Sequence, residues 1–405
     1  MKKYVQLFLG IMSIASVNAQ ELESLIEQAE LNNPEIQAYE LRYNIASEKI
    51  NEVNTLPNTE ISAGVFASEP ETRTGAQKGR FSAKQMIPWF GTITARENYA
   101  SSMADAQYED LVIAKRKLTL AVSQSYYRLY AIRAKQQVLD ENIELLKTYE
   151  RLALTSVEVG NASAVDVLRL QIRQNELEQS KEVLNAEYQA EQTLFNNLLN
   201  RDENTQVDAY DGFTVPDVDP VFVEGDLQLH PELVKYDKLY ESVTKSELLN
   251  QKEALPNLGF GLDYIPVTER PAMDFSDNGK DIIMPMVSLS IPIFNNRYKS
   301  ISKQNELRQQ EITAQKAERT NKLETFLSEA INQRDAYRIR FNVQQRNIEK
   351  ANDAEEILIK SYETGTIDFN DVLDVQELQL KFQTNQIESI KGYYIQSANI
   401  NYLKS

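Results

Sequence analysis

Histidine and cysteine, the side chains most often used to bind metals and move protons, are nearly missing from this chain. It contains no cysteine and a single histidine, His230. Zinc and copper sites are built mostly from these two residue types, so neither kind of site is expected. His230 stands directly before a Pro-Glu pair, as Asn33 does earlier in the chain. Because asparagine commonly caps helices, we interpret His230 as a cap residue rather than a metal ligand or general base.

Other signatures of enzymes are also missing from the sequence. Neither a G-x-x-x-x-G-K-[S/T] loop nor a G-x-G-x-x-G loop occurs, and the many carboxylates fall mostly on charged helical stretches. We therefore expect no cofactor and no enzyme activity. The formal net charge of −17 argues against nucleic acid as a partner, since phosphates would repel it. An acidic lumen that favours cations is the functional interpretation of this charge, and a solvated acidic surface is the simpler one.

The first 19 residues have the layout of a secretory signal peptide. Lys2 and Lys3 are followed by an apolar run over 5–17, and small residues at 17–19 precede Gln20. This run is too short to span a membrane as a helix, and no later segment reaches about 18 consecutive apolar residues. We expect an exported chain that starts at Gln20. Any part of it that enters a membrane must then do so as β-strands of a closed barrel.

The sequence repeats itself with an offset of roughly 200 residues. Five landmarks occur twice in the same order, which chance would rarely produce. We interpret the chain as two copies of one unit, 20–200 and 226–405, joined by a linker over 201–225 that is rich in turn-forming residues. The paired landmarks are Asn33-Pro34-Glu35 with His230-Pro231-Glu232, Leu56-Pro57-Asn58 with Leu255-Pro256-Asn257, Ile87-Pro88 with Ile291-Pro292, Gly160 with Gly365, and Asp166-Val167-Leu168 with Asp371-Val372-Leu373.

Each copy predicts the same succession of helices. A first helix opens at a proline, a very long helix follows two short strands, and a last helix follows a glycine turn. In the long helices, core positions recur with 4-3-4-3 spacing, from Leu118 to Leu146 and from Leu323 to Tyr362, which is typical of a coiled coil. At 1.5 Å per residue each long helix would measure roughly 100 Å, and the two shorter helices laid end to end would cover it. The predicted helices are 34–54, 92–156 and 163–199, and then 231–253, 296–363 and 369–403.

Four segments alternate apolar with small or polar residues: about 59–68, 80–88, 257–267 and 281–291. This is the pattern of a barrel wall with lipid outside and water inside. Four strands cannot close a barrel, whereas three chains would supply twelve. The turn-rich segments 69–79 and 269–280 are the expected outward loops. The same alternation also fits two soluble hairpins that cap a coiled coil.

Together these features resemble the TolC family of outer-membrane efflux proteins, over the whole mature chain. The resemblance implies a mainly α-helical chain with a small β part, whose four strands join a trimeric twelve-stranded transmembrane β-barrel in the outer membrane. Antiparallel helices would form a coiled-coil tunnel in the periplasm, where an adaptor and an inner-membrane pump dock. The motifs that carry it are Asn33-Pro34-Glu35, Glu48-Lys49-Ile50-Asn51-Glu52, Ile291-Pro292-Ile293-Phe294, Tyr362-Glu363-Thr364-Gly365-Thr366 and Asp371-Val372-Leu373-Asp374.

The resemblance also assigns site residues. Closing contacts and an acidic constriction at the periplasmic gate are expected at Tyr362, Asp371, Asp374 and Asp166. The alternative for Asp166 and Asp371 is a carboxylate that stabilises a helix N-terminus. Well-known members carry an arginine two residues after the second tip glycine, and Ile367 stands there instead. Adaptor contacts are expected at the two tips, Val159, Gly160 and Asn161, and Thr364, Gly365 and Thr366.

The function implied is that of a homotrimeric outer-membrane channel in a tripartite efflux or type I secretion system. The chain would conduct a substrate passively, after the pump and the periplasmic adaptor deliver it. A soluble periplasmic coiled-coil adaptor or scaffold is the alternative. However, an adaptor is expected to carry a compact β-rich domain between its helical arms, and the sequence predicts none. Whether the cargo is a drug, a metal ion or a protein is not encoded in any motif.

Overall fold

The computed structural model is mainly helical with a small β part, which confirms the predicted fold class. Its chain divides into two compact units. The first comprises residues up to 39, 112–231 and 320 onwards, and the second comprises 40–111 and 232–319. The residues that the structure describes are 21–158, 163–207, 212–219, 226–271, 273–364, 366–367 and 369–404.

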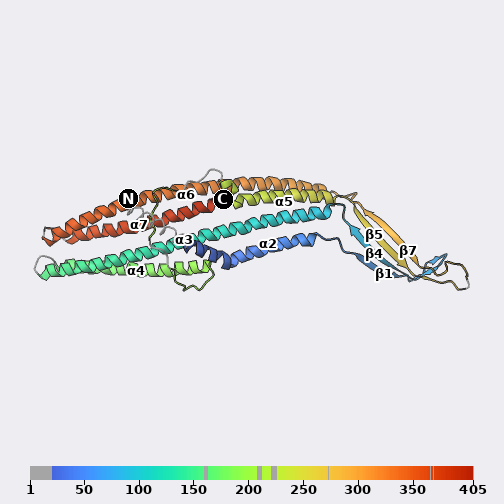
Figure 1. The fold of residues 1–405 in the computed structure, drawn as a ribbon, viewed down its shortest axis with the longest axis horizontal. Helices are drawn as coiled ribbons and strands as arrows, with labels where there is room; N and C mark the ends of the chain where they lie inside the picture. Colours follow the sequence, from blue (N-terminus) through green and yellow to red (C-terminus); the bar gives the residue numbers. More distant parts are fainter. Residues whose placement is uncertain are drawn as a thin grey trace, which may run out of the picture. The chain divides into compact units, whose positions relative to one another are not determined.

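The four predicted strands of the second unit form one antiparallel sheet. Figure 1 shows β5, β4, β7 and β1 side by side. The pairing of β4 with β5 joins two hairpins that are distant in sequence and sets Ala83 opposite Leu262. β1 and β7 are the edges, and within the described chain each pairs on one side only. In their order across the sheet the strands are β1 (Glu60–Val65), β4 (Gly79–Ile87), β5 (Asn257–Ile265) and β7 (Ile282–Ser290).

The strand register places the alternating apolar residues predicted for each of the four strands on the same face of the sheet. Partner residues share a face, and apart from Gly79 and Gln85 every paired residue on this face is apolar or Tyr264. Val65 and Val287 are 88% and 74% exposed. Each of these side chains would cost free energy in water, so the face requires a cover. Its large members are Ile61, Val65, Phe81, Ile87, Leu258, Phe260, Leu262, Tyr264, Ile283, Val287 and Leu289.

The opposite face of the sheet holds its charged and hydroxyl side chains, together with Met86, Met284, Met286, Ile265 and Ile282. Arg80 makes an ion pair with Asp263, whose side chain is fully buried. Lys84 is the register partner of Glu60 on the same face, so a second pair of opposite charges stands beside the first. Charges on this face therefore occur as pairs of opposite sign, which suits a wall that meets water without a large net field.

The first predicted outward loop, 69–79, contains two short strands, and a third lies just before the second predicted loop. β2 (Glu71–Thr72) pairs with β3 (Gly75–Gln77), which pairs with β6 (Val267–Thr268). A side chain cannot replace Gly75, because its φ is 131° and a Cβ there would lie 1.9 Å from the Thr268 carbonyl oxygen. Arg270 donates to Glu71 at 2.9 Å. The loops of the two hairpins are thus joined to each other.

The helices of the second unit follow the order of the strands that they adjoin. α2 (Pro34–Val53) precedes β1, α3 (Thr92–Glu158) follows β4, α5 (Pro231–Glu253) precedes β5, and α6 (Arg297–Glu363) follows β7. Tyr43 of α2 packs edge-to-face on Tyr108 of α3 at 5.4 Å. Arg96 of α3 pairs with Glu253 of α5 at 3.1 Å. The helices therefore lie in the order α2-α3-α5-α6, which Figure 1 shows for these segments.

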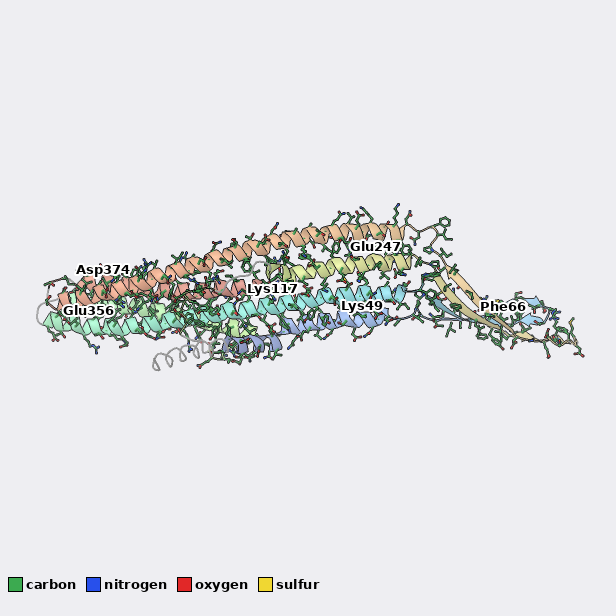
Figure 2. The ribbon with its side chains drawn as sticks, turned by 45° about the horizontal axis from the view of Figure 1, so that its top comes forward. Lys49, Phe66, Lys117, Glu247, Glu356 and Asp374 are labelled. Carbon is green, nitrogen blue, oxygen red and sulfur yellow. The ribbon has the colours of Figure 1, made fainter. Side chains whose placement is uncertain are left out.

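Polar contacts join α5 to α6. The Asn250 amide donates to the Tyr298 carbonyl oxygen at 2.9 Å. Glu247, labelled in Figure 2, accepts hydrogen bonds from Ser302 at 2.7 Å and Asn305 at 2.9 Å. Burial opposes its ionisation, but the hydrogen bonds from Asn305 and Ser302 more than offset this and lower the pKa of Glu247.

Two helices of 67 residues each, α3 and α6, continue into the first unit. There their partners are α4 (Ala164–Leu198) and α7 (Phe369–Leu403), of 35 residues each. The predicted coiled-coil positions from Leu118 to Leu146 and from Leu323 to Tyr362 are all buried or half-buried, which confirms them. Among the described residues, no helix combines the length and the hydrophobicity needed to cross a membrane.

Within the first unit, α3 contacts both α4 and α7. Ser125 of α3 donates to Glu191 of α4 at 2.6 Å, and Gln124 of α3 donates to Asn399 of α7 at 2.8 Å. α6 packs on α7 through contacts that belong to the candidate site. The order in this unit is therefore α4-α3-α7-α6.

Asn33 and His230 occupy corresponding places in the first unit. The Asn33 side chain accepts from the Glu35 amide and donates to the carbonyl oxygen of Leu198, both at 2.9 Å. Nε2 of the buried His230 lies 3.1 Å from the carbonyl oxygen of Tyr402. Each residue thus ties the start of a first helix to the end of the last helix of the same copy. This contact accounts for His230 without a metal or a proton transfer.

Candidate functional site

The expected gate lies in the first unit, where α3 ends and α4 begins and where α6 ends and α7 begins. Val159, Gly160, Asn161 and Gly365 fall outside the described residues. Tyr362, Asp371, Asp374 and Asp166 are described, as are Thr364 and Thr366. Tyr362 is a member of one apolar cluster that joins the four helices.

Tyr362 lies inside this cluster. Its ring meets Phe369 of α7 edge-on at 4.8 Å, and Phe369 meets Tyr149 of α3 at 5.8 Å. The Tyr362 side chain is buried, and its hydroxyl finds no hydrogen-bond partner within the described chain. An unsatisfied buried hydroxyl costs about 1–3 kcal/mol. Tyr362 is therefore the one predicted gate residue whose polar atom is buried without a partner in the described part of this chain.

A polar network that the sequence did not single out lies next to Tyr362. Tyr149 of α3 donates to Glu355 of α6, which also accepts from Gln379 of α7 at 2.6 Å. Gln379 donates to Asn352 as well, at 3.0 Å. Burial raises the pKa of the Tyr149 hydroxyl, and the hydrogen bond to Glu355 and its charge raise it further. Three helices are thus joined by one carboxylate.

Asp166 has the structural role that was the alternative to a gate. Ser163 caps α4: its hydroxyl accepts from the Val165 amide at 3.1 Å, while the Asp166 carboxylate accepts from the Ser163 amide at 3.2 Å. This reciprocal pair is a capping box. The negative charge also suits the helix N-terminus. Because the Asp166 side chain is buried and engaged, it is not free to close a gate in this conformation.

Replacing Ser163 with alanine is expected to destabilise the first turn of α4 by about 1 kcal/mol, because the Val165 amide loses its partner. Hydrogen exchange of that turn should accelerate, while the centre of α4 keeps its protection. Leu168→Ala, an exposed substitution one turn further on, is the control. Unchanged exchange at the start of α4 in the Ser163 variant would contradict the capping role.

Asp371 and Asp374 are exposed near the start of α7. Figure 2 labels Asp374 on this helix. The chain does not bring either carboxylate into a hydrogen bond with Tyr362, whose hydroxyl is unpaired. Lying three residues apart, both project from one side of the helix. Asp371 also suits the N-terminal turn of α7.

The second tip is held by hydroxyl groups at the end of α6. Those of Thr364 and Thr366 donate to the carbonyl oxygen of Ser361 at 2.9 and 2.8 Å, and satisfy a helix end that would otherwise be unpaired. Ile367, two residues after the second tip glycine, packs against the apolar cluster around Tyr362.

A second cluster lies further along α6 and α7 and involves the predicted linker. Asp219 accepts from Tyr393 at 2.6 Å, forms an ion pair with Arg338, and lies 3.3 Å from Arg334. Arg334 is buried. Burial and the hydrogen bond to Asp219 raise the pKa of the Tyr393 hydroxyl. One carboxylate from the linker, that of Asp219, therefore lies against the positive charges of two guanidinium groups.

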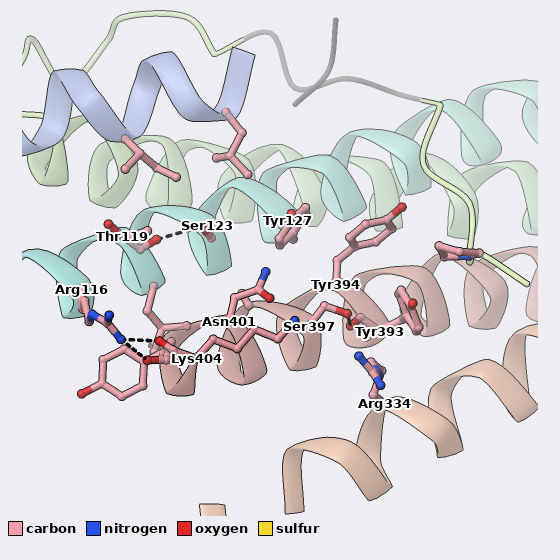
Figure 3. A pocket seen from close by; sticks show the side chains of 16 residues that line it. Arg116, Thr119, Ser123, Tyr127, Arg334, Tyr393, Tyr394, Ser397, Asn401 and Lys404 are labelled. Atoms are coloured by element: carbon pink, nitrogen blue, oxygen red, sulfur yellow. Dashed lines mark hydrogen bonds between the residues drawn. The ribbon is translucent and has the colours of Figure 1, made fainter. Parts of the chain in front are cut away.

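Aromatic packing holds the same linker segment. The Phe213 ring lies 4.9 Å from that of Tyr130 and 4.8 Å from that of Tyr394, whose hydroxyl donates to the Thr214 carbonyl at 2.9 Å. An adjoining cavity of about 650 Å³ is lined by Arg334, Tyr394 and residues of α3 (Figure 3). Residues 212–219 are therefore a packed element of the first unit, anchored to α3, α6 and α7.

No group of three or more histidine, cysteine, aspartate or glutamate side chains positioned to hold a metal ion occurs in the described chain. What the arrangement offers is structural: a sheet with one apolar face and two open edges, continued by paired long helices, with a cluster of apolar and acidic residues at their ends. This is the class of subunit that builds a wall together with further copies.

Comparison with known proteins agrees with this class. The sequence profile described as Outer membrane efflux protein matches residues 25–198. The sequence matches no curated protein. Its fold is that of CusC, with a TM-score of 0.77 at 14% identity, covering 95% of this chain and 92% of that one. VceC of Vibrio cholerae has a TM-score of 0.73 at 16% identity, with 95% and 96% covered. The outer-membrane channel CmeC of Campylobacter jejuni has a TM-score of 0.75 at 15% sequence identity, and the match covers 94% of this chain and 85% of that chain.

Residues 25–198 are thus similar to outer membrane efflux proteins, and the chain shares its fold with solved channel structures. At these identities the solved structures establish a shared fold, and they do so over nearly the whole chain. The profile match lies within the first of the two predicted copies.

Proposed function

We propose that three copies of this chain form an outer-membrane channel through which a tripartite efflux or type I secretion system releases its substrate. The observation that carries the proposal is the four-stranded sheet. One of its faces is apolar and exposed, the other carries its charged side chains, and both of its edges lack a partner within the described chain. Three such sheets joined edge to edge supply twelve strands with lipid-facing side chains outside and polar ones inside.

The ends of the long helices suit a gate. Asp371 and Asp374 would form acidic rings, which can bind cations and tune conduction. The unpaired Tyr362 hydroxyl would find its partner only when further chains are present. Exposed apolar side chains of α4, Val165 and Leu168, follow the first tip and offer a surface to an adaptor or to a neighbouring subunit. An inner-membrane pump and a periplasmic adaptor are the partners that the proposal includes.

A soluble coiled-coil adaptor or scaffold fits the chain less well. It would leave the apolar face of the sheet in water, although contiguous apolar patches of this kind are rarely exposed on soluble monomers. No compact β-rich domain interrupts the helical arms in the described chain, and an adaptor is expected to have one. The channel leaves no such face uncovered.

Membrane extraction tests the proposal directly. The mature chain is expected in the outer-membrane fraction, released only by detergent, with a mass in detergent that fits three chains after correction for bound detergent. Reconstituted into a planar bilayer, it is expected to give discrete conductance steps. Recovery of a soluble monomer without detergent would contradict both the membrane location and the trimer.

A further inference from the structure

The cavity in Figure 3 is a feature of the first unit that the proposed channel does not use. Its volume of about 650 Å³ lies in the range of pockets that bind drug-sized molecules. The helical segment 21–32, α3 and α7 form most of its wall, and Arg334 of α6 and Pro216 complete it. Along α6, Arg334 and Tyr362 are roughly 40 Å apart at 1.5 Å per residue, so the cavity is separate from the candidate gate.

This cavity is basic although the protein is acidic. It is lined by 16 of the described residues, of which three are basic and none is a carboxylate. The chain as a whole has a formal net charge of −17. The three basic residues are Arg116 of α3, Arg334 of α6 and Lys404, which directly follows α7. A wall with this charge attracts an anion.

Arg334 is the main reason to expect a ligand in this cavity. It is only 8% exposed, and its Nε has no hydrogen-bond partner within the described chain. One of its terminal nitrogens lies 3.3 Å from Asp219, but the same carboxylate also pairs with Arg338. One positive charge therefore remains in excess at this end of the cavity. A bound carboxylate would balance that charge and could accept from the guanidinium group.

The remainder of the wall suits an aromatic body. The rings of Tyr127 and Tyr394 stack on each other at 5.1 Å, and both line the cavity. Leu22, Ile26 and Leu120 add apolar surface. Burial raises the pKa of the Tyr127 hydroxyl and the nearby Tyr394 raises it further, so this hydroxyl remains a neutral donor. A ligand with rings at these side chains would remove its apolar surface from water.

We propose that this cavity binds a small aromatic carboxylate, with its negative group at Arg334 and its rings against Tyr127 and Tyr394. Such a ligand contacts α3, α7, Arg334 of α6 and Pro216 of the segment 212–219 at the same time. Because it binds only the folded chain, it also stabilises the first unit against unfolding. The site does not depend on the proposed channel, since all of its residues belong to one unit of one chain.

Dansylglycine is a suitable probe, because it joins a fluorescent aromatic body to a single carboxylate, and dansylamide is its neutral counterpart. Each is titrated into the purified mature chain in detergent, and the signal from detergent alone is subtracted. We expect saturable binding of dansylglycine with a rise in fluorescence. Dansylamide should bind about tenfold more weakly, because it brings no charge to Arg334. Dansylglycine should also raise the unfolding temperature of the chain.

Three variants place the probe in the cavity. Arg334→Gln should weaken the binding of dansylglycine about tenfold and leave that of dansylamide unchanged, because it removes only the positive charge. Ala398→Phe fills the cavity without removing a charge and should weaken the binding of both probes. Lys117→Gln is the control, since Lys117, labelled in Figure 2, is an exposed neighbour of Arg116 outside the cavity. It should leave both affinities unchanged.

Several results would overturn the site. These are no saturable binding of dansylglycine, equal affinities for the two probes, or an Arg334 variant that binds dansylglycine as well as the Lys117 variant does. If Arg334→Gln does not fold, Ala398→Phe decides, because unchanged binding of dansylglycine in that variant would place the probe elsewhere. Recovery of the chain as a soluble monomer contradicts only the channel, and the same titrations then test the site without detergent.

Discussion

Asp219→Ala is expected to lower the unfolding free energy of the chain by about 3–5 kcal/mol, the range for removing one partner of a buried ion pair. Asp219 is the carboxylate that compensates Arg334 and Arg338, and it accepts from Tyr393. Nε of both arginines is already buried without a partner within the described chain. Without Asp219, two guanidinium groups would remain near each other in a poorly hydrated place.

Thermal unfolding followed by far-ultraviolet circular dichroism in detergent measures this effect. Asp217→Ala is the matched control, because it removes the same charge from an exposed position two residues away and is expected to change stability by less than about 0.5 kcal/mol. Asp219→Asn should fall between the two, since an amide oxygen still accepts from Tyr393. Equal melting temperatures for the Asp217 and Asp219 variants would show that the linker segment does not hold α6 and α7.

Sequence periodicity predicted the helices and strands well because each has a partner along its whole length. The 4-3-4-3 rows of α3 and α6 are buried as expected, and the polar residues within them mark the buried polar contacts. An arginine at a buried coiled-coil position, such as Arg334, requires an anion next to it. A glutamate at such a position, such as Glu355, requires a hydrogen-bond donor. The structure supplies these partners as Asp219 and Tyr149. Polar residues at coiled-coil positions were therefore the signal for both clusters that the sequence analysis missed.

Other features could not be predicted because they depend on contacts between distant segments. Spacing alone could not tell that β4 pairs with β5, which brings the apolar residues of the two hairpins to a shared face. Nor could it decide between the two roles of Asp166, since the capping box depends on the backbone at Ser163. The packed segment 212–219 has the composition of a linker, and its order comes from Phe213 and Asp219 fitting onto three helices.

Tyr362→Phe combined with Asp371→Ala is expected to raise the single-channel conductance in a planar bilayer. The Tyr362 hydroxyl is buried without a partner in the described chain, so removing it should not weaken the fold of one chain. Any effect of that substitution on conductance would then report a partner from another subunit. Asp371 is exposed, and its removal would take one negative charge per subunit from the expected constriction, so cation selectivity should fall as conductance rises.

The single variants separate the two contributions. Asp371→Ala alone should change selectivity, whereas Tyr362→Phe alone should change the time spent open. Asp353→Ala, which removes an exposed carboxylate of α6 that pairs only at the surface with Lys350, is the control for lost charge. If conductance, selectivity and open time all match the unmodified channel, neither residue belongs to the gate. Closure would then rest on the apolar cluster that Ile367 joins, because no arginine stands there to form a polar lock.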